Sequence, residues 1–283
     1  MKVTNHKLAP EAKDFDISFE KSPNVSGEFK SGLPDSIILH YTAGASLESS
    51  VAWLKNPQAK ASAHLVVCKT GKIVQLAPFN IRTWHAGRSI WNGRKHLNLS
   101  SIGIEIDNAG LLHKRGDGYY ASFGKKIEDK DVILAAHKHQ TELKAWEAYT
   151  PEQVEAVEMI CLTLMKQYES IKDILGHEDI SPGRKVDPGP AFPLQSFREK
   201  ILFGRGDEES DDELVPVGKT GVVTADLLNI RSKPILGAPL AGEPLGRGTK
   251  LKVEKTEGGW SYVKVELEGW VSSKWVKTFS EEK

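Results

Sequence analysis

Short apolar segments alternate with helical patterns in the first part of the chain, and this alternation is the feature that most constrains the fold. The segments are rich in Ile, Leu and Val and end at Gly, Pro or Asn, as buried strands do. They cover residues 36–43, 62–68, 72–77 and 101–107. Such interleaving predicts an α/β domain with a mixed central β-sheet flanked by helices.

Two helices have recognisable first residues. Ser46 is a candidate cap for a helix over 46–56, and Thr150, Pro151 and Gln153 form a capping-box start for a helix over 150–168. Each has an apolar stripe at helical spacing, made by Leu47, Val51 and Leu54 in the first and by Val154, Val157, Cys161, Leu164 and Tyr168 in the second. A third helix, over 194–203, is expected to close this domain.

An acidic run with Gly and Pro, residues 204–218, interrupts the apolar patterning as a solvated linker would. We therefore expect one domain over 1–204, a linker over 205–217 and a second domain over 218–283. After the linker the apolar period changes to two, with Leu251 and Val253 between charged residues and a Gly258-Gly259 turn. This pattern predicts a small all-β barrel.

Composition excludes several classes of partner. Lys plus Arg number 38 and Asp plus Glu number 38, so the charge balance predicts no nucleic-acid or membrane-surface partner. The two cysteines, Cys68 and Cys161, lie in apolar runs and indicate neither a disulfide framework nor a zinc motif. The amino terminus lacks the apolar stretch of a secretory signal, and no segment reaches membrane-spanning length. A cytoplasmic, monomeric protein is the default expectation, with the cell wall or periplasm as its site of action if it is exported by another route.

A stiff loop over 176–190, GHEDISPGRKVDPGP, presents His177, Lys185 and Asp187 among several prolines and glycines. His40 stands late in the expected strand 36–43. His40, His177 and Asp187 together would offer a metal ion two imidazoles and a carboxylate, donors that suit zinc and leave one position free for water. Spacing alone leaves open the alternative that these are ordinary strand and loop residues.

A carboxylate in the middle of an apolar strand is a second candidate for chemistry. In 101–107 (SIGIEID), Ile102, Ile104 and Ile106 share one face and leave Glu105 on the other. Glu105 is a candidate proton acceptor, unless this is an edge strand with a solvated face. Asp107 is less favoured. Lys185 lies two residues before Asp187 and is a candidate for stabilising an oxyanion, although a surface lysine would look the same.

Five motifs in order carry a resemblance to a known family. HYTAG, SAHLVV, WHAG, SIGIEID and GHEDISPGRKVDPGPAF together resemble the type 2 N-acetylmuramoyl-L-alanine amidases, zinc enzymes of the peptidoglycan recognition protein superfamily, over roughly residues 30–200. The resemblance implies that His40, His177 and Asp187 bind Zn²⁺, that Glu105 is the catalytic base and that Lys185 stabilises the transition state. It also implies the substrate bond, the amide between the lactyl group of N-acetylmuramic acid and L-alanine of the peptidoglycan stem peptide.

The resemblance also marks candidate substrate-binding residues. Trp84, His85 and Trp91 match a stretch that borders the groove in this family, although core packing explains tryptophans equally well. Some relatives have a tyrosine before the histidine that matches His64, whereas Ala63 stands here. His64 is a further candidate, with a satisfied buried histidine as the commoner alternative. The cluster 137–139 (HKH) is interpreted as a surface feature of a helical region without a carboxylate partner.

The C-terminal part resembles bacterial SH3-like domains over about residues 218–279, on the segments DLLNIRSKP and EGWVSSKWV. The resemblance implies a cell-wall-binding domain. Trp260, Trp270 and Trp275 are candidates for its binding face or for its core.

Three functions remain open at this point. The leading one is a zinc-dependent amidase acting on peptidoglycan or muropeptides. The others are a recognition module that binds peptidoglycan without cutting it, and a zinc peptidase that acts within the stem peptide.

Overall fold

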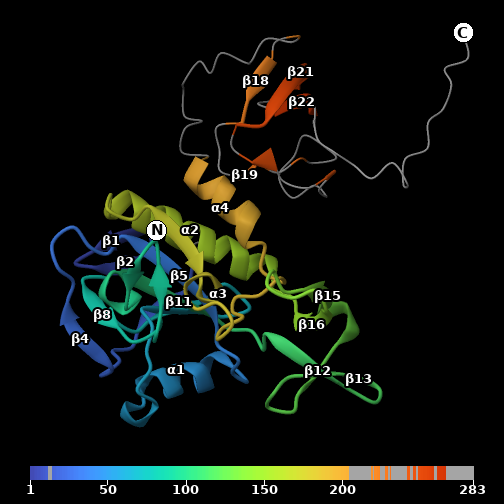
Figure 1. Cartoon of the computed structure of the whole chain (residues 1–283). Coiled ribbons are helices and arrows are strands. Elements are labelled where there is room, and N and C mark those ends of the chain that lie inside the picture. Colours follow the sequence, from blue (N-terminus) through green and yellow to red (C-terminus); the bar gives the residue numbers. More distant parts are fainter. Residues whose placement is uncertain are drawn as a thin grey trace, which may run out of the picture. The chain divides into compact units, whose positions relative to one another are not determined.

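The structure, a computed structural model, divides into two compact units, Met1–Arg205 and Gly206–Lys283. It describes residues 1–11 and 15–203, together with 218, 220–223, 227–228, 230, 241–242, 245–246, 248–257 and 260–265. Figure 1 labels the helices and strands along the chain. Each unit is described by itself below.

A six-stranded mixed sheet forms the centre of the first unit (Figure 1). Its strands, in spatial order, are β17 (Asp173–Gly176), β5 (Ser36–Tyr41), β11 (Ser101–Ile106), β6 (Leu65–Val67), β7 (Ile73–Gln75) and β3 (Ile17–Phe19). The pairing of β6 with β7 is antiparallel and every other neighbouring pair is parallel. The predicted mixed sheet with helices is therefore confirmed, and the four expected strands contain β5, β6, β7 and β11.

Helices α2 (Pro151–Gln167) and α4 (Leu194–Phe203) pack against one face of this sheet. Ile102, Ile104 and Ile106 of β11 point to that face and are fully buried. The opposite face receives α1 (Leu47–Lys55), which packs on β6 and β7. Because side chains alternate along a strand, His40 and Glu105 lie on the face away from α2.

Both predicted helix starts are confirmed. Ser46 accepts a hydrogen bond from the backbone N–H of Ser49, and the Ser49 side chain caps Ser46 in return. Thr150 and Gln153 make the same reciprocal pair at the start of α2. These capping boxes satisfy donors that the first turn of a helix leaves unpaired.

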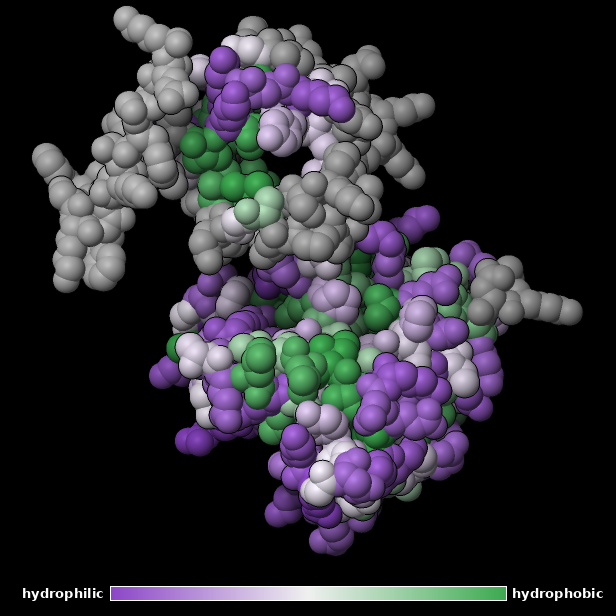
Figure 2. Space-filling model, turned by 90° about the vertical axis from the view of Figure 1, so that its right-hand side faces the viewer, coloured by the Kyte–Doolittle hydropathy of each residue, from purple (hydrophilic) through white to green (hydrophobic). Residues whose placement is uncertain are grey.

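A second, five-stranded antiparallel sheet lies between β11 and α2 in the sequence, and the sequence analysis did not predict it. Its strands, in spatial order, are β14 (Lys126–Ile127), β13 (Gly118–Tyr120), β12 (Leu111–Arg115), β16 (Leu143–Glu147) and β15 (Val132–Ala136). Figure 2 views the molecule from the side on which β15 and β16 lie, and apolar side chains gather there. Ile133, Leu134 and Leu143 of these two strands are exposed.

Shorter elements complete the first unit. Three two-stranded antiparallel pairs are β1 (Lys2–Thr4) with β2 (Lys7–Ala9), β4 (Val25–Glu28) with β8 (Ile81–Thr83), and β9 (Ile90–Trp91) with β10 (Arg94–Lys95). The remaining helices are α3 (His177–Ile180) and three 3₁₀ turns, η1 (Pro57–Ala59), η2 (Leu97–Leu99) and η3 (Asp129–Asp131). Within the described part of the chain, no helix is long and apolar enough to cross a lipid bilayer.

The second unit has antiparallel strands, as the period-two pattern predicted. Strand β21 (Lys250–Glu257) pairs with β18 (Thr220–Val222) and with β22 (Trp260–Val265), and β19 (Leu227–Leu228) pairs with β20 (Leu245–Gly246). Val253 of β21 is 1% exposed. The expected linker 205–217, Gly258-Gly259, Trp270 and Trp275 lie outside the described residues. The SH3-like assignment stays a prediction.

Candidate metal centre and catalytic groove

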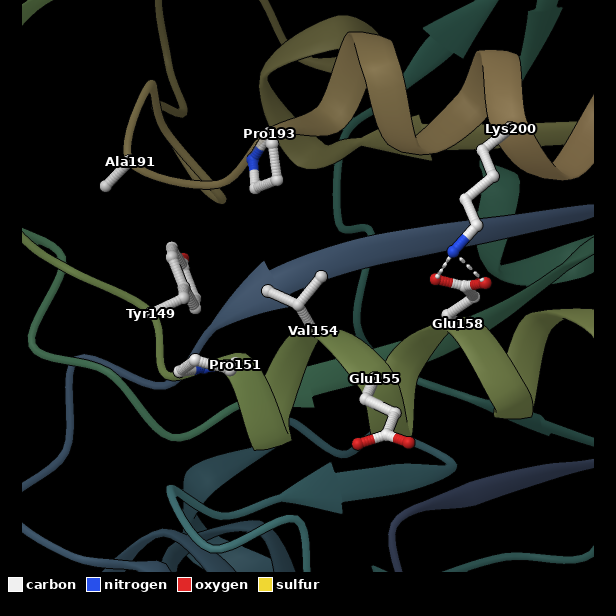
Figure 3. A pocket seen from close by; sticks show the side chains of 8 residues that line it. All are labelled: Tyr149, Pro151, Val154, Glu155, Glu158, Ala191, Pro193 and Lys200. Carbon is white, nitrogen blue, oxygen red and sulfur yellow. Dashed lines mark hydrogen bonds and ion pairs between the residues drawn. The ribbon is translucent and has the colours of Figure 1, made fainter. Parts of the chain in front are cut away.

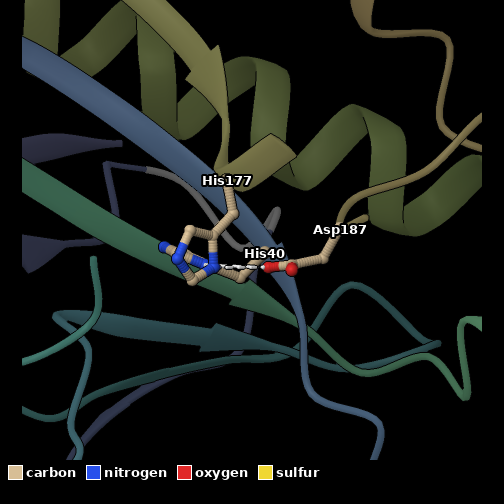
Figure 4. A group of neighbouring side chains, drawn as sticks. All are labelled: His40, His177 and Asp187. Atoms are coloured by element: carbon tan, nitrogen blue, oxygen red, sulfur yellow. Dashed lines mark hydrogen bonds and ion pairs between the residues drawn. The ribbon is translucent and has the colours of Figure 1, made fainter. Parts of the chain in front are cut away.

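Three side chains that are far apart in the sequence meet at one edge of the central sheet. His40 is the fifth residue of β5, and His177 is the first residue of α3, directly after β17. Strands β5 and β17 are parallel neighbours, so their carboxyl ends lie at the same edge. Asp187 follows on the loop after α3. Figure 4 shows the three side chains pointing toward one another.

The ligand atoms of these three residues are close together and shielded from solvent. His40 Nδ1 lies 2.9 Å from His177 Nδ1 and 3.0 Å from Asp187 Oδ2, and His177 Nδ1 lies 2.9 Å from the same oxygen. All three side chains are buried. The structure thus brings together the three residues that the sequence analysis named as metal ligands.

The donor set fits a divalent ion of the zinc type. His177 Nε2 lies 3.1 Å from the carbonyl oxygen of Ala86, which only accepts hydrogen bonds, so the ring proton sits on Nε2 and Nδ1 carries a lone pair. That lone pair faces a carboxylate oxygen and a second imidazole nitrogen. Electron-rich atoms this close repel unless a cation lies among them, and two imidazoles with one carboxylate are ligands that zinc prefers.

The electrostatics keep two of these ligands, His40 and Asp187, in the forms that a metal ion needs. Burial, together with the repulsion that a proton on His177 would exert, lowers the pKa of His40 to about 4, so its imidazole is neutral at physiological pH. Burial alone would raise the pKa of Asp187, but its contacts with His177 and His40 outweigh burial and hold that pKa below the usual range. Neutral imidazoles and an ionised carboxylate are the metal-binding forms.

The loop that carries Asp187 is held from two sides. The backbone N–H of Glu178 donates to the carbonyl oxygen of Asp187 at 2.9 Å. The hydroxyl of Tyr149, just before α2, donates to the carbonyl oxygen of Pro188 at 2.8 Å. Gly189 has φ of +75° and packs against Trp146, where a Cβ would stand 2.8 Å from the ring. These contacts fix the carboxylate before any ion is present.

Glu105 lies beside the metal ligands on the neighbouring strand. In the parallel pairing of β11 with β5, Glu105 is opposite His40. Its Oε2 is buried and has no hydrogen-bond partner among the residues that the structure describes. Burial and the charge of Asp187 raise the pKa of Glu105 to about 8, against the opposing charge of Lys185. A carboxyl group with so high a pKa is suited to carry a proton near neutral pH.

A groove of about 400 Å³ opens over these groups. His40, Glu105, His177 and Asp187 line it, together with Trp84, His85, Arg184 and Lys185. Arg184 and Lys185 bring two cationic side chains to one wall. The predicted positions of Glu105, Lys185, Trp84 and His85 therefore all border one groove.

Two other predicted substrate contacts, His64 and Trp91, make hydrogen bonds to protein atoms. His64 is fully buried, and its Nε2 lies 2.8 Å from the carbonyl oxygen of Ile81. Its Nδ1 accepts a hydrogen bond from the backbone N–H of Gly103 at 3.0 Å, so neither ring nitrogen is available to a substrate. Trp91 donates from Nε1 to Asp173 Oδ2 at 3.2 Å and packs against an apolar cluster. Trp91 is not among the residues that line the groove.

The interpretation of 137–139 as a helical surface feature is wrong for the helix and for His137, whereas Lys138 and His139 are exposed as predicted. His137 directly follows β15 and is 2% exposed. Its Nε2 lies 2.5 Å from Glu178 Oε2, and Lys138 Nζ lies 3.0 Å from the other oxygen of that carboxylate. The carboxylate partner was missed because it lies 41 residues away in the sequence. Glu178 follows the ligand His177, so this ion pair ties the second sheet to the metal centre.

The sequence analysis also missed Arg184 and Gly103. The Arg184 guanidinium donates to the carbonyl oxygens of Ala86 and Arg88 and joins two loops at the groove. Its only signal was its position beside Lys185. Gly103 was not singled out as a site residue. A Cβ at this position would stand 2.4 Å from the ring of His85, so glycine makes room for that ring.

A larger hollow of about 570 Å³ lies elsewhere, between α2 and α4 (Figure 3). Val154, Pro193 and Ala191 border it, and Lys200 pairs with Glu158 at its rim. That pairing neutralises both charges. The hollow contains none of the groups gathered around His40, so the chemistry belongs to the smaller groove.

The fold and the site define an α/β protein with a His–His–Asp metal-binding arrangement at one edge of its sheet. The sequence pattern of the N-acetylmuramoyl-L-alanine amidase family matches residues 30–190, more than half of the chain, and the chain therefore belongs to this family.

Individual relatives support this membership. The 1,6-anhydro-N-acetylmuramyl-L-alanine amidase AmpD of Salmonella typhimurium (strain SL1344) is 34% identical over 145 residues, which cover 51% of this chain and 59% of AmpD. N-acetylmuramoyl-L-alanine amidase A of Achromobacter lyticus is 34% identical over 173 residues, which cover 60% of this chain and 85% of that protein. The chain spans about three fifths of the length of the AmpD relative.

A solved structure shows the same fold. The crystal structure of a selenomethionine AmpD derivative has a TM-score of 0.50 at 24% identity and covers 71% of this chain and 99% of that chain. At this identity the likeness concerns the fold alone.

Proposed function

We propose that this chain is a zinc-dependent N-acetylmuramoyl-L-alanine amidase. It hydrolyses the amide that joins the lactyl group of N-acetylmuramic acid to the L-alanine of the stem peptide. The observation that carries the proposal is the convergence of His40, His177 and Asp187 beside the buried carboxyl group of Glu105. The names of the family and of the relatives point to the same bond.

His40, His177 and Asp187 would hold the zinc ion. When bound there, zinc acts as a Lewis acid toward an amide carbonyl and makes a nearby water more acidic. Asp187 and His177 are held by the backbone of the loop and of α3, so the ligand set needs little rearrangement. A site that is already ordered loses less entropy on binding its ion.

Glu105 is the proposed proton carrier. Its carboxylate accepts a proton from the attacking water and then delivers it to the leaving nitrogen of L-alanine, so that the peptide departs as a free amine. Burial supports this role because it raises the pKa of Glu105 to about 8, close to the pH at which both transfers must occur. The orphaned Oε2 is the atom with free hydrogen-bonding capacity.

Lys185 is the proposed stabiliser of the negative charge that develops on the carbonyl oxygen. It lies on the groove wall near Glu105 and Asp187. An ammonium group that is in position before the reaction lowers the barrier more than mobile solvent does. Trp84, on the same groove, offers an aromatic surface for the sugar or the peptide stem.

The substrate class we propose is peptidoglycan or the muropeptides released from it. The second unit is proposed to be an SH3-like wall-binding domain that raises the local concentration of the amidase at its substrate. The antiparallel β18, β21 and β22 support this assignment.

The test is a digest of sacculi and of isolated muropeptides, analysed by mass spectrometry. The zinc-loaded chain should release intact stem peptides with a free L-alanine amine, and the chelator-treated chain should release none. Cuts between two stem-peptide residues would instead identify a peptidase. Binding without any released peptide would identify a recognition module.

Glu105→Ala separates the metal site from the proton carrier. This variant should keep its zinc, because Glu105 is not a ligand, and should lose roughly 10²–10⁴-fold in kcat. Elemental analysis and the same digest measure the two properties. Asp107→Asn, directly after the same strand, is the matched control and should retain activity. Full activity of Glu105→Ala would remove Glu105 from the mechanism.

A further inference from the structure

A chain of hydrogen bonds runs from the backbone of β11 through His85 to the metal ligand His40. His85 Nε2 lies 3.2 Å from the carbonyl oxygen of Ser101. His85 Nδ1 lies 3.0 Å from His40 Nε2, the ring nitrogen that faces away from the metal centre. The two rings meet edge to face at 81°. The ring proton can occupy either nitrogen of an imidazole. Which atom donates and which accepts in each of these hydrogen bonds must therefore be derived from the end of the series at which the roles are certain.

That end is Ser101. Its hydroxyl donates to the carbonyl oxygen of Leu97 at 2.6 Å, so toward His85 the serine offers only acceptors. His85 Nε2 must therefore carry the proton. A buried imidazole is neutral and holds one ring proton, which leaves a lone pair on His85 Nδ1. That lone pair accepts the proton on His40 Nε2, and His40 Nδ1 is left with its lone pair directed at Asp187.

We propose that His85 is a positioning residue that fixes the tautomer and the ring orientation of His40 for metal binding. It does so as an acceptor whose own proton is anchored on the Ser101 carbonyl. The inference rests on the proposed metal site. It adds a residue that holds the ligand His40 at the ring nitrogen facing away from the metal ion. Such partners of ligating histidines orient the ring and raise its basicity.

The backbone around His85 is built for this purpose. The N–H groups of His85 and Ala86 both donate to Asn98 Oδ1, at 3.0 Å and 2.7 Å. The same short segment thus supplies the His85 ring to His40 and the Ala86 carbonyl to His177. Gly103 leaves the space that the ring occupies, because a Cβ there would overlap it. One segment therefore sets the proton positions of both ligand imidazoles.

This role differs from the substrate contact that the sequence predicted for His85. Both of its ring nitrogens are engaged by protein atoms, and the side chain is buried at 8% exposure. His85 borders the groove but has no free polar side-chain atom for a ligand. Loss of His85 should therefore weaken metal binding in the absence of any substrate.

Two variants of similar shape test the proposal in the full chain. His85→Asn keeps an acceptor, since Oδ1 of asparagine lies near the position of Nδ1, whereas His85→Leu removes it. The Kd for Zn²⁺ is measured by competition with a chromophoric chelator. His85→Leu should bind zinc about 10–100-fold more weakly than the unaltered chain, and His85→Asn should stay within about threefold of it. Equal weakening in both variants would overturn the proposal, because packing alone would then explain the effect.

A second measurement reads the tautomer directly. Long-range ¹H–¹⁵N correlation spectra of the metal-free chain distinguish Nε2–H from Nδ1–H imidazoles. His40 should be the Nε2–H form in the unaltered chain and in His85→Asn, and a mixture in His85→Leu. An unchanged His40 spectrum in His85→Leu would sink the idea. Neither readout uses catalysis, so the absence of amidase activity would refute the proposed function and leave this inference standing.

Discussion

At the scale of single residues, the buried carboxyl group of Glu105 opposes stability in the metal-free chain. Glu105 has a pKa of about 8 when folded, against a reference value of 4.5. Between these values the folded chain holds one more proton than the unfolded chain. The contribution of Glu105 to the free energy of unfolding must therefore fall as pH rises through this window, at a slope of up to about 1.4 kcal/mol per pH unit.

Glu105→Gln should remove this slope, because glutamine keeps the shape but has no proton to lose. We expect the metal-free variant to unfold at the same temperature as the unaltered chain near pH 4.5 and at a higher temperature near pH 8. Thermal unfolding followed by circular dichroism across this range checks the difference. Parallel curves for the two proteins would show that Glu105 ionises normally. The metal must be absent, since a nearby cation favours the ionised carboxylate.

At the scale of elements, helix α3 depends on the second sheet. Glu178 of α3 is buried, and its carboxylate is paired with His137 and Lys138 at the end of β15. Removing a buried hydrogen-bond partner of a carboxylate leaves that group poorly satisfied, which costs about 1–3 kcal/mol or more. The retained contact of Lys138 should reduce this cost.

His137→Leu should therefore lower the free energy of unfolding by about 1–3 kcal/mol and weaken zinc binding, because His177 precedes Glu178. Chemical denaturation and the chelator competition measure the two effects. His139→Leu is the matched control, since His139 is exposed two residues further along the same loop and should leave both quantities unchanged. Equal effects of the two substitutions would contradict a specific tie between β15 and α3.

The same elements show what the sequence was able to predict. Strands β5 and β11 are rich in Ile and Leu, and α1 and α2 begin at capping boxes, so local signals determine them. Strands β12 to β16 are short and carry exposed Leu134 and Leu143, so their periodicity is weak. The burial of His137 depends on Glu178, and the role of His85 depends on Ser101 and His40. No local pattern encodes such partners.

The metal ligands were predictable for a different reason. Histidine, lysine and aspartate on a loop stiffened by proline indicated a candidate metal site, and the order of five motifs indicated a resemblance to the amidase family. What the sequence alone did not supply was the geometry, namely that two Nδ1 atoms face one oxygen within 3.0 Å. Parallel pairing of β5 with β17 produces it by bringing two strand ends together.

At the scale of the whole molecule, metal binding should stabilise the first unit and leave the second unchanged. All three ligands lie in Met1–Arg205, and the described segments of the second unit contain no comparable group of ligands. An ion that binds only the folded state stabilises it by about 2.7 kcal/mol at a concentration of 100 times its Kd. For amides that exchange through unfolding of the first unit, this corresponds to a slowing of about 100-fold.

Hydrogen exchange of the full chain, read by mass spectrometry, tests this expectation. Peptides that contain β5 and β17 should exchange about 100-fold more slowly with zinc than after chelation, and peptides that contain β21 and β22 should exchange at the same rate. Magnesium should not replace zinc, because two of the three ligands are imidazoles. His177→Ala should abolish the protection, since the two remaining ligands no longer enclose an ion. Protection that appears equally in β21 and β22, or persists in His177→Ala, would mean that zinc acts somewhere other than the site at the edge of the central sheet.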